Sequence, residues 1–275
     1  MRFSEEKKHS YMMYIIEQIQ KNGTDISRRV SESLKIGKST VNNYLNELQA
    51  KEIIKKIKKN EYQLITEKHI FTLLRDKGEL DSDTYAFDNC IKPYITDCSE
   101  EAKNIWNYAL TEMVNNVMDH SNADILRITI IKNYYQTKIF LTDNGVGIFK
   151  KIKEHFGYDS LDEARLELFK GKLTTDEKNH SGEGIFFTSR MMDTFSILSG
   201  GKVFSTNKYK NDENFDVENL DDINGTCVAM TLSNNTHRKI SDVFDMYANV
   251  DGGFFKTTLP LKNIFDESPV SRSQA

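Results

Sequence analysis

The sequence predicts an α+β protein of two domains, and three observations carry this prediction. In the first 66 residues, apolar residues recur at helical spacing and then alternate as in a short hairpin. Further along, a long amphipathic helix precedes strands rich in Ile, Tyr and Phe. Charge divides the chain in the same way. Thirteen Lys and Arg stand against eight Asp and Glu through Thr66, a surplus of five; the whole chain carries −4, so the remainder carries −9.

Composition excludes several classes of protein. The chain is 38% hydrophobic and 28% charged, as globular proteins are. No apolar run approaches the roughly 18 residues of a membrane span, and the charged N-terminus lacks a signal-peptide core. A cytoplasmic protein without a membrane partner is therefore expected. The cysteines are odd in number and lack CxxC spacing, which argues against a disulfide framework or a zinc site and predicts buried reduced thiols at Cys90, Cys98 and Cys227.

The basic first segment predicts three helices followed by a hairpin. Helical spacing covers residues 10–21, and Asn22-Gly23 ends that helix. A second short helix follows, with Asp25 or Ser27 as its cap. Ser39 is the expected N-cap of a third helix, from Thr40 to about Lys51. Residues 53–58 and 62–65 then predict two strands joined by a turn at 59–61.

This pattern resembles a bacterial winged helix-turn-helix DNA-binding domain, assigned to residues 1–66. The stretch from Lys38 to Leu45 is similar to the start of a recognition helix, whose N-terminal turn enters the major groove. The resemblance implies phosphate contacts from basic side chains and base contacts from short polar ones, at Arg28, Arg29, Lys38, Ser39, Thr40, Asn42 and Asn43. Two alternatives stay open: a winged helix used for protein contacts, and a merely solvated lysine face.

The second domain is organised around a helix that ends at His120. At about 100° per residue, its polar side chains fall within an arc of about 140° and include no Lys or Arg: Glu112, Asn115, Asn116, Asp119 and His120. Such a face suits a cation or a ligand, although an ordinary surface helix remains the alternative.

Three glycine-containing steps follow in order. Asp143 ends a predicted strand and precedes Gly145 and Gly147, a loop in which backbone can approach a ligand closely. Gly182 and Gly184 open an apolar helix, and glycines before a helix offer N–H groups to phosphate. A Gly-Thr step at Thr226 leads into the last predicted strand. Each step alone is a weak signal.

In this order, after a helix with Glu-x-x-x-Asn, the steps resemble the ATPase domain of gyrase, the ninety-kilodalton heat-shock chaperone, histidine kinases and the mismatch-repair ATPase, the GHKL superfamily. The resemblance implies a Bergerat-type two-layer α/β sandwich with a mixed sheet over residues 67–236, and a lid at about 149–180. It also implies ATP and Mg²⁺ as cofactors.

Site roles follow from the resemblance residue by residue. Asn116 would complete the coordination of Mg²⁺, and Glu112 would orient or deprotonate the attacking water or hydroxyl. Asp143 would bind the adenine amino group, and Thr226 would join the network beneath adenine. Gly145 and Gly147 would let the backbone run close to the base and would form the hinge of the lid. Gly182 and Gly184 would contact phosphates.

The tail, residues 237–275, predicts a helix at 240–247 and a strand at 254–261, and residues 270–275 resemble the opening of a STAS-like domain. Bacterial proteins with a winged helix, this ATPase and a STAS-like domain form a family, and the chain is expected to stop where the third domain would begin. The implied function is a regulator that couples ATP to DNA binding, with slow ATP hydrolysis or serine phosphorylation of a STAS-type partner, and with homodimerisation. The alternatives are a non-catalytic nucleotide-sensing transcription factor and a scaffold with a vestigial nucleotide site.

Overall fold

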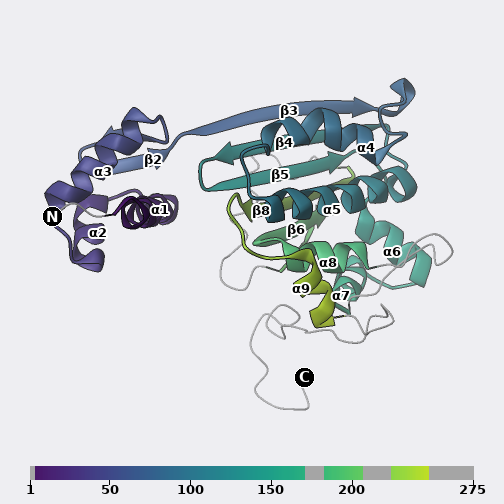
Figure 1. Cartoon of the computed structure of the whole chain (residues 1–275). Helices are drawn as coiled ribbons and strands as arrows, with labels where there is room; N and C mark the ends of the chain where they lie inside the picture. Colours follow the sequence, from purple (N-terminus) through teal and green to yellow (C-terminus); the bar gives the residue numbers. More distant parts are fainter. Residues whose placement is uncertain (1–3, 171–182, 207–223, 248–275) are drawn as a thin grey trace, which may run out of the picture. The chain divides into compact units, whose positions relative to one another are not determined.

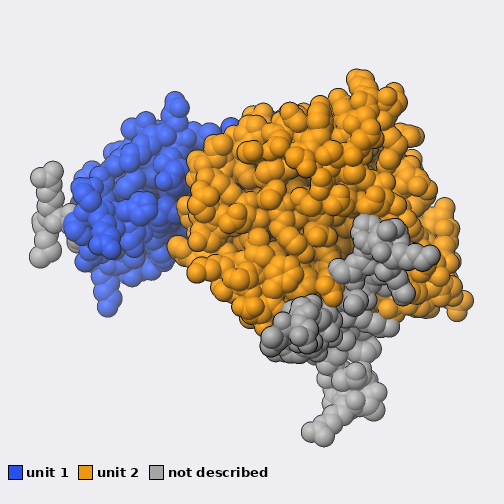
Figure 2. All heavy atoms as spheres, turned by 45° about the vertical axis from the view of Figure 1, so that its right-hand side comes forward, with its two compact units in different colours: residues 1–68, 131–137 blue, residues 69–130, 138–275 orange. Residues whose placement is uncertain are grey.

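The computed structural model describes residues 4–170, 183–206 and 224–247, and it divides into two compact units (Figure 2). Unit 1 comprises Met1–Lys68 with Ile131–Thr137, and unit 2 comprises His69–Ile130 with Lys138–Ala275. Helices and strands occur in both halves of the chain (Figure 1). The predicted α+β class is therefore confirmed.

Unit 1 contains three helices and a hairpin, labelled in Figure 1: α1 (Glu5–Lys21), α2 (Ile26–Leu34), α3 (Lys38–Ala50), β1 (Ile54–Lys58) and β2 (Glu61–Leu64). Strands β1 and β2 pair antiparallel, with Ile54 opposite Leu64. The helices bury the apolar side chains that recur at helical spacing, among them Ile15, Ile26 and Leu45, each fully buried. These contacts form the hydrophobic core of unit 1.

Two predicted boundaries in unit 1 are wrong. Helix α1 begins at Glu5 because the Ser4 side chain caps it, accepting from the backbone N–H of Lys7 at 3.3 Å. Helix α3 begins at Lys38, and its N-cap is Gly37 rather than Ser39. The Gly37 carbonyl already accepts from the N–H groups of Thr40 and Val41, so Ser39 lies inside the first turn with an exposed side chain.

Unit 2 is built on a sheet that has six strands within the described residues, in the order β3-β4-β5-β8-β6-β7. Their bounds are β3 (Thr66–Leu74), β4 (Ile125–Asn133), β5 (Gln136–Asp143), β8 (Thr226–Ser233), β6 (Thr194–Ser199) and β7 (Lys202–Ser205). Strand β6 pairs antiparallel with both β7 and β8. Strand β8, the last strand among the described residues, thus lies inside the sheet, next to β5.

The β4–β5 turn lies at Tyr134 and Tyr135, between the end of β4 and the start of β5. The Asn133 side-chain oxygen accepts from the N–H groups of Tyr135 and Gln136, at 2.9 and 3.0 Å. This Asn-based turn fixes the chain reversal at Tyr134 and Tyr135.

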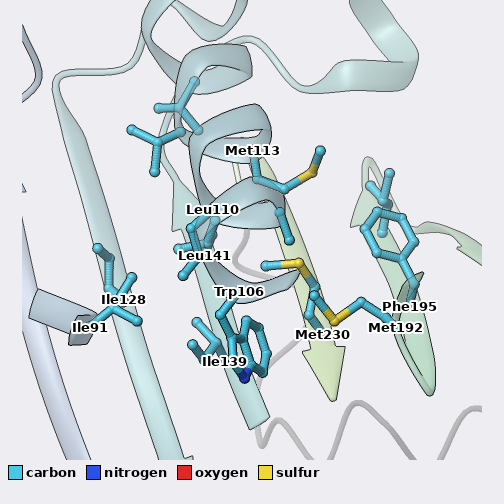
Figure 3. Packing of buried hydrophobic residues seen from close by; sticks show 14 of the residues in the cluster. Ile91, Trp106, Leu110, Met113, Ile128, Ile139, Leu141, Met192, Phe195 and Met230 are labelled. Carbon is cyan, nitrogen blue, oxygen red and sulfur yellow. The ribbon is translucent and has the colours of Figure 1, made fainter. Parts of the chain in front are cut away.

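One face of the sheet is covered by helices. Within the described residues, the α-helices of unit 2 are α4 (Asp83–Ala86), α5 (Glu100–Asn116), α6 (Ile148–Phe156), α7 (Leu161–Lys170), α8 (Gly184–Met191) and α9 (Ile240–Tyr247). Short 3-10 turns η1 (Arg75–Lys77) and η3 (Lys92–Tyr94) and π-helical turns η2 (Phe87–Ile91) and η4 (Val117–Ser121) complete them. Helix α5 lies across the strands, and its Trp106, Leu110 and Met113 pack with Ile139, Leu141 and Met230 of the sheet (Figures 1 and 3).

The segments predicted as a lid and as a tail each begin with residues that pack in unit 2. The predicted lid starts at residue 149, yet Phe149 and Ile152 of α6 are buried in the core of unit 2. The predicted tail starts at 237, yet Val243 of α9 is buried in that same core. Ring centroids of Phe187 and Phe244 lie 4.3 Å apart. Helices α6 and α9 are therefore parts of unit 2. The predicted strand at 254–261, the STAS-like residues 270–275 and most of the later lid, 171–180, lie outside the described residues.

Among the helices that the structure describes, none combines the length and the apolar character that crossing a membrane requires.

The packing of α9 can be tested by Phe244→Ala. This change should lower the free energy of unfolding by about 2–4 kcal/mol, because Phe244 contacts Phe187 and lies 5.8 Å from Tyr108 between ring centroids. Urea unfolding followed by fluorescence of Trp106, the single tryptophan, reports on unit 2. Met246→Ala on the same helix is the control, because Met246 is 55% exposed and should cost under about 0.5 kcal/mol. Equal costs for the two changes would contradict this packing.

Candidate functional site

A buried carboxylate marks the end of β5. The Asp143 residue is only 6% exposed, and its Oδ1 accepts a hydrogen bond from the Gly145 N–H at 2.8 Å. Burial raises the pKa of Asp143, whereas the backbone N–H groups of Gly145 and Thr226 lower it. An ionised carboxylate has about four lone-pair positions, so these two donors leave it able to accept from a ligand.

The raised pKa of Asp143 has a consequence for stability. The folded chain holds this proton at pH values where the unfolded chain has lost it. The contribution of Asp143 therefore makes the ligand-free fold more stable as the pH falls from neutrality towards the usual carboxyl pKa of 3.8. At neutral pH the ionised group destabilises the fold, whereas a carboxylate that stabilises a fold has a lowered pKa.

The start of β8 presses against Asp143. A Cβ on Gly225 would overlap the Asp143 carbonyl and would lie 2.5 Å from its Oδ1. The Gly225 carbonyl accepts from the Ser199 hydroxyl at 2.8 Å, and the Thr226 hydroxyl accepts from the Ile148 N–H at 3.0 Å. The central place of β8 in the sheet thus joins two predicted site residues, Asp143 and Thr226, that lie far apart in sequence.

The loop after Asp143 is also locked to the end of the long helix. A Cβ on Gly145 would collide with the Ser121 backbone, and the Ser121 carbonyl accepts from the Val146 N–H at 2.8 Å. Gly147 has φ +83° and is the N-cap of α6. The geometry therefore gathers Asp143, Gly145, Gly147 and Thr226 into one cluster.

A second junction joins α5 to the start of α8. Glu112 and Asn116 are half-buried on α5. Gly184 is the first residue of α8, and a Cβ there would overlap the Glu112 carboxylate. Burial raises the pKa of Tyr108, and the charges of Glu112 and Glu183 raise it further. The two carboxylates therefore lie close enough to Tyr108 to act on its hydroxyl group.

The remaining polar residues of the long helix have other surroundings. The Asn115 side chain donates to Asp83 Oδ2 at 3.4 Å, and Asp119 is exposed. The His120 backbone carbonyl accepts from Lys151 Nζ at 2.8 Å. Gly182 lies outside the described residues.

Two basic side chains that sequence reasoning missed hold the C-terminal end of the long helix. Arg75 Nε donates to the Ala123 carbonyl at 2.6 Å, and its Nη2 donates to the Met118 carbonyl at 3.4 Å. Lys151 is the second of these side chains, through its bond to the His120 carbonyl. Arg75 and Lys151 together donate to carbonyl groups in and just after the π-helical turn η4. Arg75 lies 43 to 48 residues from these acceptors, so nothing local in the sequence pointed to it. Ser121 and Ser199 were missed as well, and Gly225 was noted as part of the Gly-Thr step but was given no role in the site.

The carboxylates do not form a metal site by themselves. In the part of the chain that the structure describes, no group of three or more His, Cys, Asp or Glu side chains could hold a metal ion. A magnesium ion at Asn116 would need most of its ligands from a bound molecule and from water.

In unit 1, the predicted DNA-contacting residues of α3 lie on its first turns. Lys38, Ser39, Asn42 and Asn43 are exposed, and Thr40 is half-buried. The lysines of the hairpin are exposed too: Lys55, Lys56, Lys58 and Lys59. Lys58 forms an ion pair with Glu61 at 2.9 Å.

The two arginines of α2 differ in what they contact. Arg28 is exposed and forms ion pairs with Asp25 at 3.3 Å and Glu32 at 4.0 Å, which surface screening makes weak. Arg29 donates to the carbonyls of Asn22 and Thr24 and, at 2.9 Å, to the side chain of Gln18. Arg29 thus ties α1 to α2, and its guanidinium serves the fold of unit 1.

The close packing around Asp143 can be tested by Gly225→Ala. The added Cβ would force Asp143 and Gly145 apart, so the free energy of unfolding should fall by about 2–3 kcal/mol in the Trp106 urea assay. Gly201→Ala is the matched control: its φ is +70°, but nothing lies within 4 Å of the added Cβ, so only backbone strain of about 1 kcal/mol is expected. A cost no larger for Gly225→Ala would contradict this geometry.

Comparison with known proteins gives no match to any protein-family model and none among curated proteins. The function therefore has to be argued from the residues of the site.

Proposed function

We propose that unit 2 is a Bergerat-type two-layer sandwich that binds ATP with Mg²⁺, and that Asp143 recognises adenine. The observation that carries the proposal is the buried Asp143 carboxylate in a loop closed by glycines. An ionised carboxylate only accepts hydrogen bonds, and the exocyclic amino group of adenine donates them. Burying an unneeded charge would cost stability, so a ligand that donates to Asp143 explains its position.

The donor set around α5 fits a metal–nucleotide complex. Asn116 would supply one side-chain oxygen to Mg²⁺, while phosphate oxygens and water supply the others. When bound, Mg²⁺ would neutralise phosphate charge.

Glu112 decides between an enzyme and a sensor. Its carboxylate lies against Gly184, the first residue of α8, where backbone N–H groups point out of the helix. A phosphate at that helix end would therefore come close to Glu112, which could orient or deprotonate a water or a protein hydroxyl. We propose slow ATP hydrolysis or serine phosphorylation, with a STAS-type protein as the acceptor. The alternative is nucleotide sensing without turnover.

We also propose that unit 1 is a winged helix-turn-helix domain that binds DNA, so that the chain is a transcription regulator. The exposed polar first turns of α3, next to exposed lysines, support this function. Lys38 and the hairpin lysines would contact phosphates, and Arg28 would join them. Arg29 is left out because its guanidinium binds Asn22, Thr24 and Gln18. ATP binding would alter DNA affinity, and homodimerisation would be one route for that coupling.

Asp143→Asn tests nucleotide recognition. The substitution keeps the shape of the side chain but can turn a donor towards the adenine amino group, so ATP affinity should fall at least about tenfold. Isothermal titration calorimetry with Mg-ATP measures this loss. The same variant should unfold at an equal or higher urea concentration than the wild type at pH 7, because a buried charge is gone. Unchanged ATP affinity in a folded variant would sink the site assignment.

Glu112→Gln distinguishes a catalytic unit 2 from one that senses nucleotide without turnover. Mg-ATP binding should persist while phosphate release or transfer falls by about 100-fold or more, the usual size of a general-base effect. A phosphate-release assay and transfer to candidate STAS proteins supply the measurement, and Glu100→Gln, at the far end of α5, is the control. If the wild type binds ATP and shows neither reaction, the sensor reading stands and catalysis is excluded.

DNA binding by unit 1 should depend steeply on salt. The four exposed lysines Lys38, Lys55, Lys56 and Lys59 would give a slope of roughly −3 to −4 in log K against log salt, and Arg28 and Lys58 would add less because they form ion pairs within unit 1. Affinity for a mixed-sequence duplex should therefore fall about 100-fold between roughly 0.05 and 0.2 M salt, as measured by fluorescence anisotropy. A complex that ignores salt, or no complex at all, would favour a protein-binding role for this unit.

A further inference from the structure

The exposed side of α3 carries a continuous row of uncharged polar side chains. Ser39, Asn42, Asn43 and Asn46 follow one another at the i, i+3, i+4 and i+7 spacing, which places them on one stripe of a helix. All four are exposed. On the opposite side, the residues that anchor α3 are buried: Val41, Tyr44, Leu45 and Leu48. The fold of unit 1 thus fixes which stripe faces outward.

This stripe does not serve the stability of α3. Asparagine is a poor helix former, costing roughly half a kcal/mol per residue relative to alanine, and α3 has three of them at exposed positions. Among the residues that the structure describes, no hydrogen bond or ion pair involves the amides of Asn42, Asn43 or Asn46. Their donors and acceptors therefore face outward with full capacity for a partner.

The chemistry of the stripe selects among the four bases. An asparagine amide donates and accepts in one plane, which matches N7 and the N6 amino group of adenine in the major groove. Guanine is read mainly by Arg or Lys, and cytosine by Asp or Glu, and the stripe contains none of these. Lys38 flanks it at the first turn, where a phosphate contact is available.

We infer that the Asn42–Asn43–Asn46 stripe reads adenine edges, so that this chain selects an adenine-containing core in the DNA it binds. The inference rests on the proposed DNA binding of unit 1 and names its specificity. From Ser39 to Asn46 the helix rises about 10.5 Å, at about 1.5 Å per residue. Base pairs are stacked about 3.4 Å apart, so the stripe covers about three consecutive base pairs.

Selection from a randomised duplex library by the full chain, followed by sequencing, tests this inference. The expected result is an enriched core of about three base pairs with adenine at two or more positions on one strand. Replacing one such A·T pair by G·C should weaken binding by about fivefold to 150-fold in anisotropy titrations. Enrichment of G·C cores, or binding without sequence preference, would overturn the inference while leaving the DNA-binding proposal intact. Absence of any DNA complex would overturn both.

Substitutions assign the preference to the stripe. Asn43→Ala and Asn46→Ala should each reduce the discrimination between A·T and G·C at one position, and Asn43→Gln should retain part of it because glutamine also pairs with adenine. Lys56→Ala on the hairpin is the matched control. It should weaken all duplexes alike and lower the salt slope by about 1. Unchanged discrimination in both alanine variants would show that another surface reads the sequence.

Discussion

The burial of the Asp143 carboxylate is the constraint on which the candidate site of unit 2 depends. Taking this charge out of water is unfavourable and raises the pKa of Asp143, and the backbone N–H groups of Gly145 and Thr226 act against that shift. Both donors come from chain that must approach very closely. Gly225 permits that approach because its missing Cβ leaves room for the Asp143 peptide. Strands β5 and β8 are neighbours in the sheet, which brings Gly225 and Thr226 to Asp143.

A second constraint is the position of the C-terminal end of α5, which hydrogen bonds fix. The polar side of that helix can present Glu112 and Asn116 only if its C-terminus is fixed. Arg75 and Lys151 hold carbonyls there, and Ser121 joins the same point to the loop beyond Asp143. The helix, the loop beyond Asp143 and the start of α6 are thus joined by one set of hydrogen bonds. In our proposal, this connection links the nucleotide base to the residues that face its phosphates.

Sequence patterns anticipated what is decided locally. Apolar spacing predicted α1, α2, α3 and α5, and the Ile- and Tyr-rich run predicted the β4–β5 pair. The polar arc around Glu112 and Asn116 was visible in the same way, and the structure keeps both half-buried. The misplaced cap at Ser39 has a local cause too, because Gly37 satisfied the first N–H groups one residue before α3 begins.

What sequence could not give is decided at long range. The place of β8 between β5 and β6, the burial of α9 in unit 2 and the reach of Arg75 to Ala123 join segments that carry no mutual signal. Arg29 is a case in which the sequence predicted a contact that the structure uses otherwise. This basic side chain was expected to contact DNA, but it donates to backbone carbonyls of its own unit. Local chemistry predicted which residues are polar and accessible in principle, and packing determined which of them face outward.

The central claim is that Asp143 accepts a hydrogen bond from the adenine amino group, and the choice of purine tests it without altering the protein. Calorimetric titration of the wild-type chain should compare Mg-ATP with Mg-ITP, in which an oxygen replaces that amino group. The account predicts that ITP binds at least about tenfold more weakly than ATP, because an acceptor would then face the buried carboxylate. Equal affinities for the two nucleotides would contradict it.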